Sequence, residues 1–222
     1  MNAFEAPAAA IAHYLTQAER VADRWVHIVG LAAAIGGGAL LFGLCIAEGA
    51  LGQTSAIAIY IACLITALAV SAAYNLAKSE EWRRRLRRLD HAAIFLMIAG
   101  SYTPFTTQRF EGAWAIGMTI AVWVIAVAAA AGKLFLPGVA KKYWVPVYLL
   151  LGWMVLGAIK PLIAGVRPEA LMLLVVGGVI YSLGVLVYVA RSLPYRRAIW
   201  HGFVVAAAAT HFAAILTGVV LV

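Results

Sequence analysis

Seven long apolar runs, separated by short polar connectors, constrain this chain more than any other feature. A helix needs ~20 mostly apolar residues to cross the ~30 Å hydrocarbon core of a bilayer. The runs are also too uniformly apolar for the ~10-residue alternating strands of a membrane barrel. The sequence therefore predicts an all-α fold, an integral membrane seven-helix bundle. The expected spans are Val26–Ala47, Ser55–Ala77, His91–Thr107, Ala113–Leu134, Tyr143–Ile163, Ala170–Ala190 and Ile199–Val222.

Composition supports the same class, because 65% of the 222 residues are apolar and only 12% are charged. Soluble domains have about 45–50% and about 25%. These values exclude a soluble globule, a disordered chain and a nucleic-acid-binding module. Cys45 and Cys63 both lie inside apolar runs without the C-x-x-C spacing of a metal or redox site, so we interpret them as buried thiols.

Residues 1–25 precede the first run and are expected to form a cytoplasmic amphipathic N-terminal segment, followed by the seven-helix domain at 26–222. Apolar residues recur there at helical spacing from Ile11 to Trp25. This pattern is typical of a helix on the membrane surface, or of a docking face for a partner. Glu5, Glu19 and Asp23 argue against a cleaved signal peptide.

Lys and Arg residues predict the orientation, since cytoplasmic connectors carry an excess of them. Of the 17 basic residues, 14 fall on the N-terminal side of the predicted membrane. We therefore expect a cytoplasmic N-terminus, an external C-terminus and a multi-pass protein of the plasma (inner) membrane. The Arg-rich run Lys78–Arg88 also fits a segment drawn to anionic headgroups, so membrane lipids are the expected partners and nucleic acid is not. The sequence does not specify a protein partner.

Polar residues at membrane depth are the candidates for function, because each is costly there unless it is paired. Four spans place such residues in the predicted cytoplasmic half, and the topology brings them to one depth. They are His27, Ser71, Asn75, Asp90, His91, Arg197 and His201. This convergence predicts a polar site in that half of the bundle.

Each of these residues also has a purely structural explanation. Ser71 can bond to a carbonyl of its own helix, and Asn75 can join two helices by a hydrogen bond. Asp90 can cap a helix, Arg197 can snorkel to the interface, and His27 and His91 can anchor at the headgroups. His201 lies several residues inside its span and is the hardest to explain in this way. His211 is deeper and on another face of the same helix, so we do not place both histidines in one site.

Several strings of residues together resemble the bacterial hemolysin III proteins, which belong to the wider progestin and adiponectin receptor superfamily. The resemblance covers nearly the whole chain. The strings are Ser71-Ala-Ala-Tyr-Asn75, Arg88-Leu-Asp-His-Ala-Ala-Ile94, Ala99-Gly-Ser-Tyr-Thr-Pro-Phe105, Ala198-Ile-Trp-His-Gly-Phe203 and Thr210-His-Phe212.

The resemblance implies a seven-helix fold with a cytoplasmic N-terminus and a zinc site in the cytoplasmic half. Its ligands would come from a Ser-x-x-x-His pair, an Asp and a His-x-x-x-His pair, and a water between metal and carboxylate would attack a lipid amide. In this chain Ser71 and Asp90 match as catalytic candidates, and His201 matches as the one metal-ligating histidine. The two other histidine positions are Asn75 and Arg197.

We therefore expect no metal cofactor, with Arg197 replacing the metal electrostatically and pairing with Asp90 while Asn75 and Ser71 complete the hydrogen bonds. The predicted function is membrane-lipid sensing or homeostasis with a degenerate polar site. The alternative is a zinc-dependent, ceramidase-like hydrolase of lipid amides, with His91 or His27 as a substitute ligand. A cytolytic pore-former is the least supported, because the chain has no amphipathic insertion hairpin. Gly100–Pro104 is expected to kink the third span and open a lipid-sized cavity.

Overall fold

The computed structural model describes residues 14–136, 139, 141–190 and 192–222, with Lys141 and Lys142 described by their backbone alone. Within these residues the chain is helical and contains no strand. The elements are α1 Gln17–Ala47, α2 Leu51–Leu76, α3 Glu80–Gln108, α4 Gly112–Phe135, α5 Lys141–Gly152, the 3₁₀ turn η1 Met154–Ala158, α6 Ile159–Gly165, α7 Pro168–Val189, α8 Arg196–Ile215 and the π-helical turn η2 Leu216–Val220. The predicted all-α fold is confirmed.

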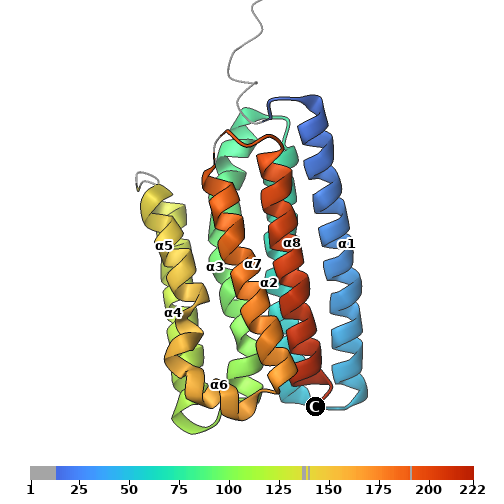
Figure 1. The fold of residues 1–222 in the computed structure, drawn as a ribbon, viewed down its shortest axis with the longest axis vertical. Coiled ribbons are helices and arrows are strands. Elements are labelled where there is room, and N and C mark those ends of the chain that lie inside the picture. Colours follow the sequence, from blue (N-terminus) through green and yellow to red (C-terminus); the bar gives the residue numbers. More distant parts are fainter. Residues whose placement is uncertain (1–13, 137–138, 140, 191) are drawn as a thin grey trace, which may run out of the picture.

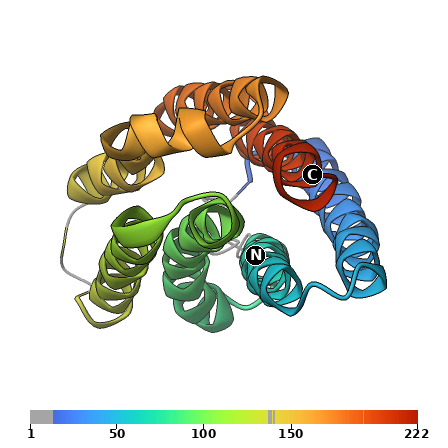
Figure 2. The same cartoon turned by 90° about the horizontal axis from the view of Figure 1, so that it is seen from below.

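The helices stand side by side in a ring that follows the order of the chain (Figures 1 and 2). Each helix packs against its sequence neighbour, and α8 returns to contact α1 and close the ring. This closure is what brings residues from the two ends of the sequence together.

Six helices in the described residues are long and apolar enough to cross a membrane: α1, α2, α4, the α5–α6 segment from Tyr143, α7, and α8 with η2. The third expected span lies in the seventh long helical segment, α3, which is less apolar and is not one of these six. Its first turns are rich in Arg, and its second half carries Ser and Thr. The chain is therefore a multi-pass membrane protein by length and composition.

The fifth expected span is present as a segment long and apolar enough to cross a membrane, but its α-helix is interrupted. α5 ends at Gly152, η1 follows, and α6 begins at Ile159. Pro161 has no N–H to bond to the Gly157 carbonyl, which weakens the helix at this point. The hydroxyl of Tyr102 satisfies backbone groups at this interruption. It accepts a hydrogen bond from the Val155 N–H at 3.0 Å and donates to the Gly152 carbonyl at 2.7 Å.

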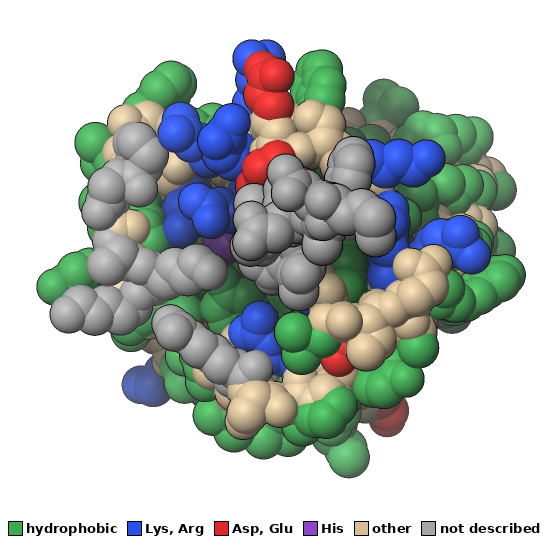
Figure 3. Space-filling model, turned by 90° about the horizontal axis from the view of Figure 1, so that it is seen from above, with side chains coloured by type: hydrophobic (Ala, Val, Ile, Leu, Met, Phe, Trp, Pro, Cys, Tyr) green, Lys and Arg blue, Asp and Glu red, His purple; other side chains and the backbone are tan. Residues whose placement is uncertain are grey.

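One end of the bundle is basic. α1, α3 and α8 begin there, and its upper face carries gathered Lys and Arg side chains (Figure 3). The chain ends at the opposite end (Figure 1). We call this the basic end. That it faces the cytoplasm stays a prediction from the Lys and Arg count.

α1 extends further back than the expected first span, beginning at Gln17 instead of Val26. Residues 17–25 therefore continue directly into the membrane helix, and residues 1–13 of the expected amphipathic segment lie outside the described residues. Thr16 caps the start of the helix, since its Oγ1 accepts from the Glu19 N–H at 3.1 Å, and the Glu19 carboxylate accepts from the Leu15 N–H at 3.0 Å.

Candidate functional site

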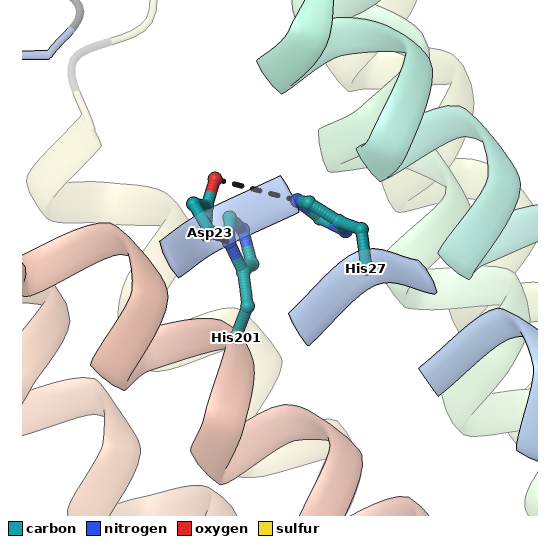
Figure 4. Close-up of side chains that lie close together, drawn as sticks. All are labelled: Asp23, His27 and His201. Atoms are coloured by element: carbon teal, nitrogen blue, oxygen red, sulfur yellow. Dashed lines mark hydrogen bonds and ion pairs between the residues drawn. The ribbon is translucent and has the colours of Figure 1, made fainter. Parts of the chain in front are cut away.

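Two helices from opposite ends of the sequence bring Asp23, His27 and His201 together in the half of the bundle nearer the basic end (Figure 4). His201 Nδ1 lies 2.6 Å from Asp23 Oδ1, which is a short, charge-assisted hydrogen bond. His27 Nε2 lies 3.5 Å from Asp23 Oδ2, and the two imidazole rings are 4.4 Å apart between centroids. The three side chains are almost completely buried, with Asp23 0%, His27 5% and His201 8% exposed.

The spacing of residues on α1 explains this placement. Asp23 and His27 are four residues apart and so lie on one face of the helix. The same face continues through Gly30, where an added Cβ would lie 2.6 Å from the side chain of Val205 on α8. The missing side chain lets α1 approach α8 closely enough for Asp23 to reach His201.

Asn75 and Arg197 extend the cluster. A carboxylate only accepts hydrogen bonds, so His201 Nδ1 donates to Asp23. Asn75 Nδ2 lies 3.4 Å from His201 Nε2 and 2.9 Å from the Ser71 carbonyl. Arg197 Nη1 donates to Asn75 Oδ1 at 3.3 Å. A chain of polar contacts thus runs from Arg197 through Asn75 and His201 to Asp23.

Tyr14, which precedes α1, also contacts the cluster. Its hydroxyl donates to Asp23 Oδ2, and the Arg197 guanidinium lies 5.6 Å from the centre of its ring. Burial raises the pKa of the Tyr14 hydroxyl, and the hydrogen bond to Asp23 raises it further. Tyr14 therefore remains a neutral hydrogen-bond donor at physiological pH.

Asp90 and His91 lie beside this cluster rather than in it. His91 Nδ1 is 3.3 Å from Asp90 Oδ2 and 2.7 Å from the Arg87 carbonyl. In the structure Arg197 donates a hydrogen bond to Asn75. The expected ion pair between Arg197 and Asp90 stays a prediction. Ser71 Oγ lies 3.4 Å from Asn75 Nδ2 at the edge of the cluster.

Two cavities meet at His201. The first has a volume of about 160 Å³ and runs through the interior of the bundle between apolar side chains, with His27, Ser71 and Asp90 at its polar end. The second, of about 280 Å³, lies nearer the basic end. Its lining includes Tyr74, Asn75, Asp90, His91, Tyr188, Arg196 and Arg197. Asp90, Trp200 and His201 belong to both linings. A polar group held at His201 therefore faces an apolar space on one side and a basic space on the other.

The positions that the resemblance assigns to zinc do not fit a metal ion. A catalytic zinc site usually has three protein ligands, and here only His201 supplies an imidazole. Arg197 brings a permanent positive charge to the same place, donating to the amide that replaces a ligand histidine.

A different set of donors is the better candidate for a metal. Asp23, His27 and His201 offer three ligand atoms that all lie within 4.8 Å of one another. Two ligands of one tetrahedral zinc ion stand about 3.3 Å apart, so Asp23 and His201, now 2.6 Å apart, would have to separate to hold it.

Asp23 and Tyr14 are the members of the cluster that sequence reasoning missed. The four-residue step from Asp23 to His27 was the available signal. It was lost because the first span was expected to begin at Val26, which left Asp23 outside the membrane. Of the residues that were expected to converge, His27, Asn75, Arg197 and His201 do so, whereas His91 packs against Tyr74.

Comparison with known proteins adds the family. Residues 16–212 match the family described as "Haemolysin-III related". The chain is 35% identical over 134 residues to the hemolysin-3 homolog of Bacillus subtilis (strain 168), covering 59% of this chain and 62% of that protein. It is 35% identical over 128 residues to hemolysin-3 of Bacillus cereus, covering 58% of each. It is 33% identical over 129 residues to the human monocyte to macrophage differentiation factor, covering 57% of this chain and 52% of that protein.

These matches thus span about three fifths or less of the length of each relative. The family match covers most of the described helices, from the start of α1 into α8. The chain belongs to the haemolysin-III related family.

Proposed function

We propose that this protein binds a single-chain membrane lipid and acts in lipid sensing or homeostasis, in the plasma (inner) membrane and without a metal ion. The observation that carries this proposal is the meeting of an apolar and a basic cavity at His201. Together their volumes reach the ~300–1,000 Å³ range of small-molecule sites. A lipid fits such a pair of spaces because it has one apolar and one polar part.

The polar part of the lipid is expected to be anionic. Arg196 and Arg197 line the cavity nearer the basic end, and the Asn75 amide lies between Arg197 and His201. Guanidinium groups bind carboxylates and phosphates with two parallel hydrogen bonds. The tail would occupy the interior cavity, where apolar side chains such as Leu64, Leu68 and Val204 form the walls.

Hydrogen bonds support the metal-free form of the site. Asp23 accepts from His201 and Tyr14, and the fixed charge of Arg197 stands next to Asn75. These contacts pair the carboxylate of Asp23 and the amide of Asn75 without a cation, as buried polar groups require, whereas His27 Nε2 has no hydrogen-bond partner among the described residues.

Binding of radiolabelled stearate to the full chain in lipid nanodiscs tests the proposal. We expect saturable binding, and Arg197→Gln is expected to weaken it about tenfold, the loss of one hydrogen bond to a charged group. The matched control is Arg85→Gln, because Arg85 is exposed and pairs with Glu81 on the surface of α3. Absence of saturable binding, or equal losses in both variants, would contradict the proposal.

A zinc-dependent hydrolase of lipid amides is the second candidate, and the Asp23–His27–His201 group is the observation that favours it. Elemental analysis of the purified protein separates the two. We expect no zinc in the natural protein. About one zinc per chain that is lost in both Asp23→Asn and His201→Ala would establish the metal instead, and lipid-amide hydrolysis would be the next assay.

A gain-of-ligand variant provides the positive control for that measurement. Asn75→His with Arg197→His restores imidazoles at the two positions where the resemblance expects them. We expect this double variant to acquire zinc, since the imidazole of His201 completes a set of three. If the double variant also binds no zinc, the absence of zinc from the natural protein cannot be attributed to the residues that replace the two histidines.

A further inference from the structure

A second polar group lies deeper in the interior cavity, away from the cluster at His201. It is formed by Tyr60 on α2, Tyr181 on α7 and His211 on α8, which all line that cavity. The rings of Tyr181 and His211 meet edge to face, 5.5 Å apart between centroids. His211 is ten residues beyond His201 on one helix, which is about 15 Å along its axis.

Two atoms of this deeper group have no hydrogen-bond partner in the part of the chain that the structure describes. They are the Tyr60 hydroxyl and His211 Nε2, and both atoms are buried. Tyr60 itself is only 2% exposed. Buried polar atoms are normally paired, and leaving them unpaired costs free energy.

Several other polar side chains along the same cavity wall are satisfied within the protein. The Ser182 hydroxyl donates to the Gly178 carbonyl and accepts from Trp153 Nε1. The hydroxyls of Tyr102 and Ser101 bond to backbone carbonyls. Among the described residues that line this cavity, His27 Nε2 at its other end also has no hydrogen-bond partner, so Tyr60 and His211 hold the unpaired atoms of its deeper part.

The fold makes specific room for the imidazole. A Cβ at position 177 would lie 2.2 Å from His211 Cδ2 and 2.5 Å from its Nε2. Any residue other than glycine at this point of α7 would collide with the ring. The His211 side chain thus occupies a space left open by Gly177, in contact with the cavity.

From these contacts we infer that the deeper group binds a hydroxyl carried on the apolar part of the ligand. A hydroxyl both donates and accepts, so it complements a tyrosine hydroxyl and an imidazole nitrogen whichever tautomer the ring adopts. The ligand class is a hydroxylated single-chain lipid, with its anionic end at Arg197 and its hydroxyl at Tyr60 and His211. This inference rests on the proposed function, because it requires the lipid to enter the interior cavity.

The test compares stearic acid with its mid-chain hydroxylated analogue, each binding to the full chain in nanodiscs. We expect the hydroxylated acid to bind about tenfold more tightly. Tyr60→Phe removes one hydroxyl and keeps the ring, so it should abolish this preference. The control is Tyr195→Phe, because Tyr195 is exposed at the start of α8, outside both cavities.

The outcomes separate this inference from the proposal beneath it. If both acids bind equally to the natural protein, as they would if a water molecule satisfied the deeper group, the inference fails and the proposed function stands. If the preference survives in Tyr60→Phe, the inference also fails. If neither acid binds, the proposed function fails and takes the inference with it.

Discussion

The two ends of the bundle bury polar side chains in different ways. At the basic end Asp23, His201 and Asn75 contact one another through their side chains. At the opposite end Gln53 Nε2 and Arg109 Nη2 both donate to the Val219 carbonyl, at 2.6 and 2.8 Å. This carbonyl belongs to the last helical turn of the chain, where carbonyls lack partners within the helix.

The difference shows that the role of a polar side chain inside the bundle depends more on which group it contacts than on how deeply it is buried. Gln53 and Arg109 complete a helix end, so their hydrogen bonds are structural. The cluster at His201 instead leaves imidazole, amide and guanidinium groups along the walls of two cavities. Only the cluster at His201 can exchange a contact within the protein for a contact with a ligand.

Removing the centre of the basic-end cluster should have the largest effect. Asp23→Ala leaves two buried imidazoles and the Tyr14 hydroxyl without their shared carboxylate. We expect a loss of about 3–5 kcal/mol, the usual cost of breaking a buried pair from one side. Thermal unfolding in detergent measures this. Asp23→Asn keeps an acceptor and should lose less, so equal losses in both variants would argue against the role of the charge.

Arg197→Ala should have the next largest effect. Its guanidinium donates to the buried Asn75 amide, and a hydrogen bond to a charged group contributes about 1.5–3 kcal/mol. The same unfolding measurement also tests the ion pair predicted with Asp90. A loss of about 3–5 kcal/mol in the free energy of unfolding that disappears in an Asp90→Ala background would favour that pair. An unchanged melting temperature would contradict both the hydrogen bond to Asn75 and the ion pair with Asp90.

Gly30→Ala tests the close approach of α1 to α8. The added Cβ would lie 2.6 Å from Val205, so we expect a loss of about 1–3 kcal/mol from overpacking. The matched control is Gly36→Ala on the same helix, where nothing lies within 4 Å of the added atom. If both variants are equally stable, the small residue at position 30 is not what sets the distance between the helices.

The opposite end should give the smallest effect. Gln53→Ala removes one neutral hydrogen bond to the Val219 carbonyl, and Arg109 still donates to that atom. We expect a loss of about 0.5–1.5 kcal/mol and no change in stearate binding. Ser55→Ala, at an exposed position two residues further along α2, serves as the control. Weakened stearate binding in Gln53→Ala would mean that the two ends are not functionally distinct.

Hydropathy was enough to predict the helices, because a membrane span is set mainly by the length of an apolar run. It did not predict the interruption between α5 and α6, where the apolar run continues but the regular α-helix does not. The broken turn is stable because the Tyr102 side chain, about fifty residues earlier, satisfies its backbone. Hydrogen bonds from a residue so far away in the sequence cannot be predicted from the local pattern of the fifth span.

The candidate site was predictable in outline, because topology alone brings the ends of helices together at one depth. His27, Asn75 and His201 could be grouped in this way. Their central partner could not, since Asp23 was assigned to the segment before the first span. The contact of Arg197 with Asn75 depends on how far α8 extends past the expected start of its span, and the helix begins three residues earlier, at Arg196.

The closure of the ring by α1 and α8 also has a consequence for biosynthesis. Chains emerge from the ribosome N-terminal end first, so Asp23 and His27 enter the membrane long before His201 has been made. The cluster forms only when the last helix docks against the first. The hydrogen bond between Asp23 and His201 therefore joins an early and a late segment of the nascent protein, and a chain interrupted before α8 keeps only the contacts of Asp23 with Tyr14 and His27.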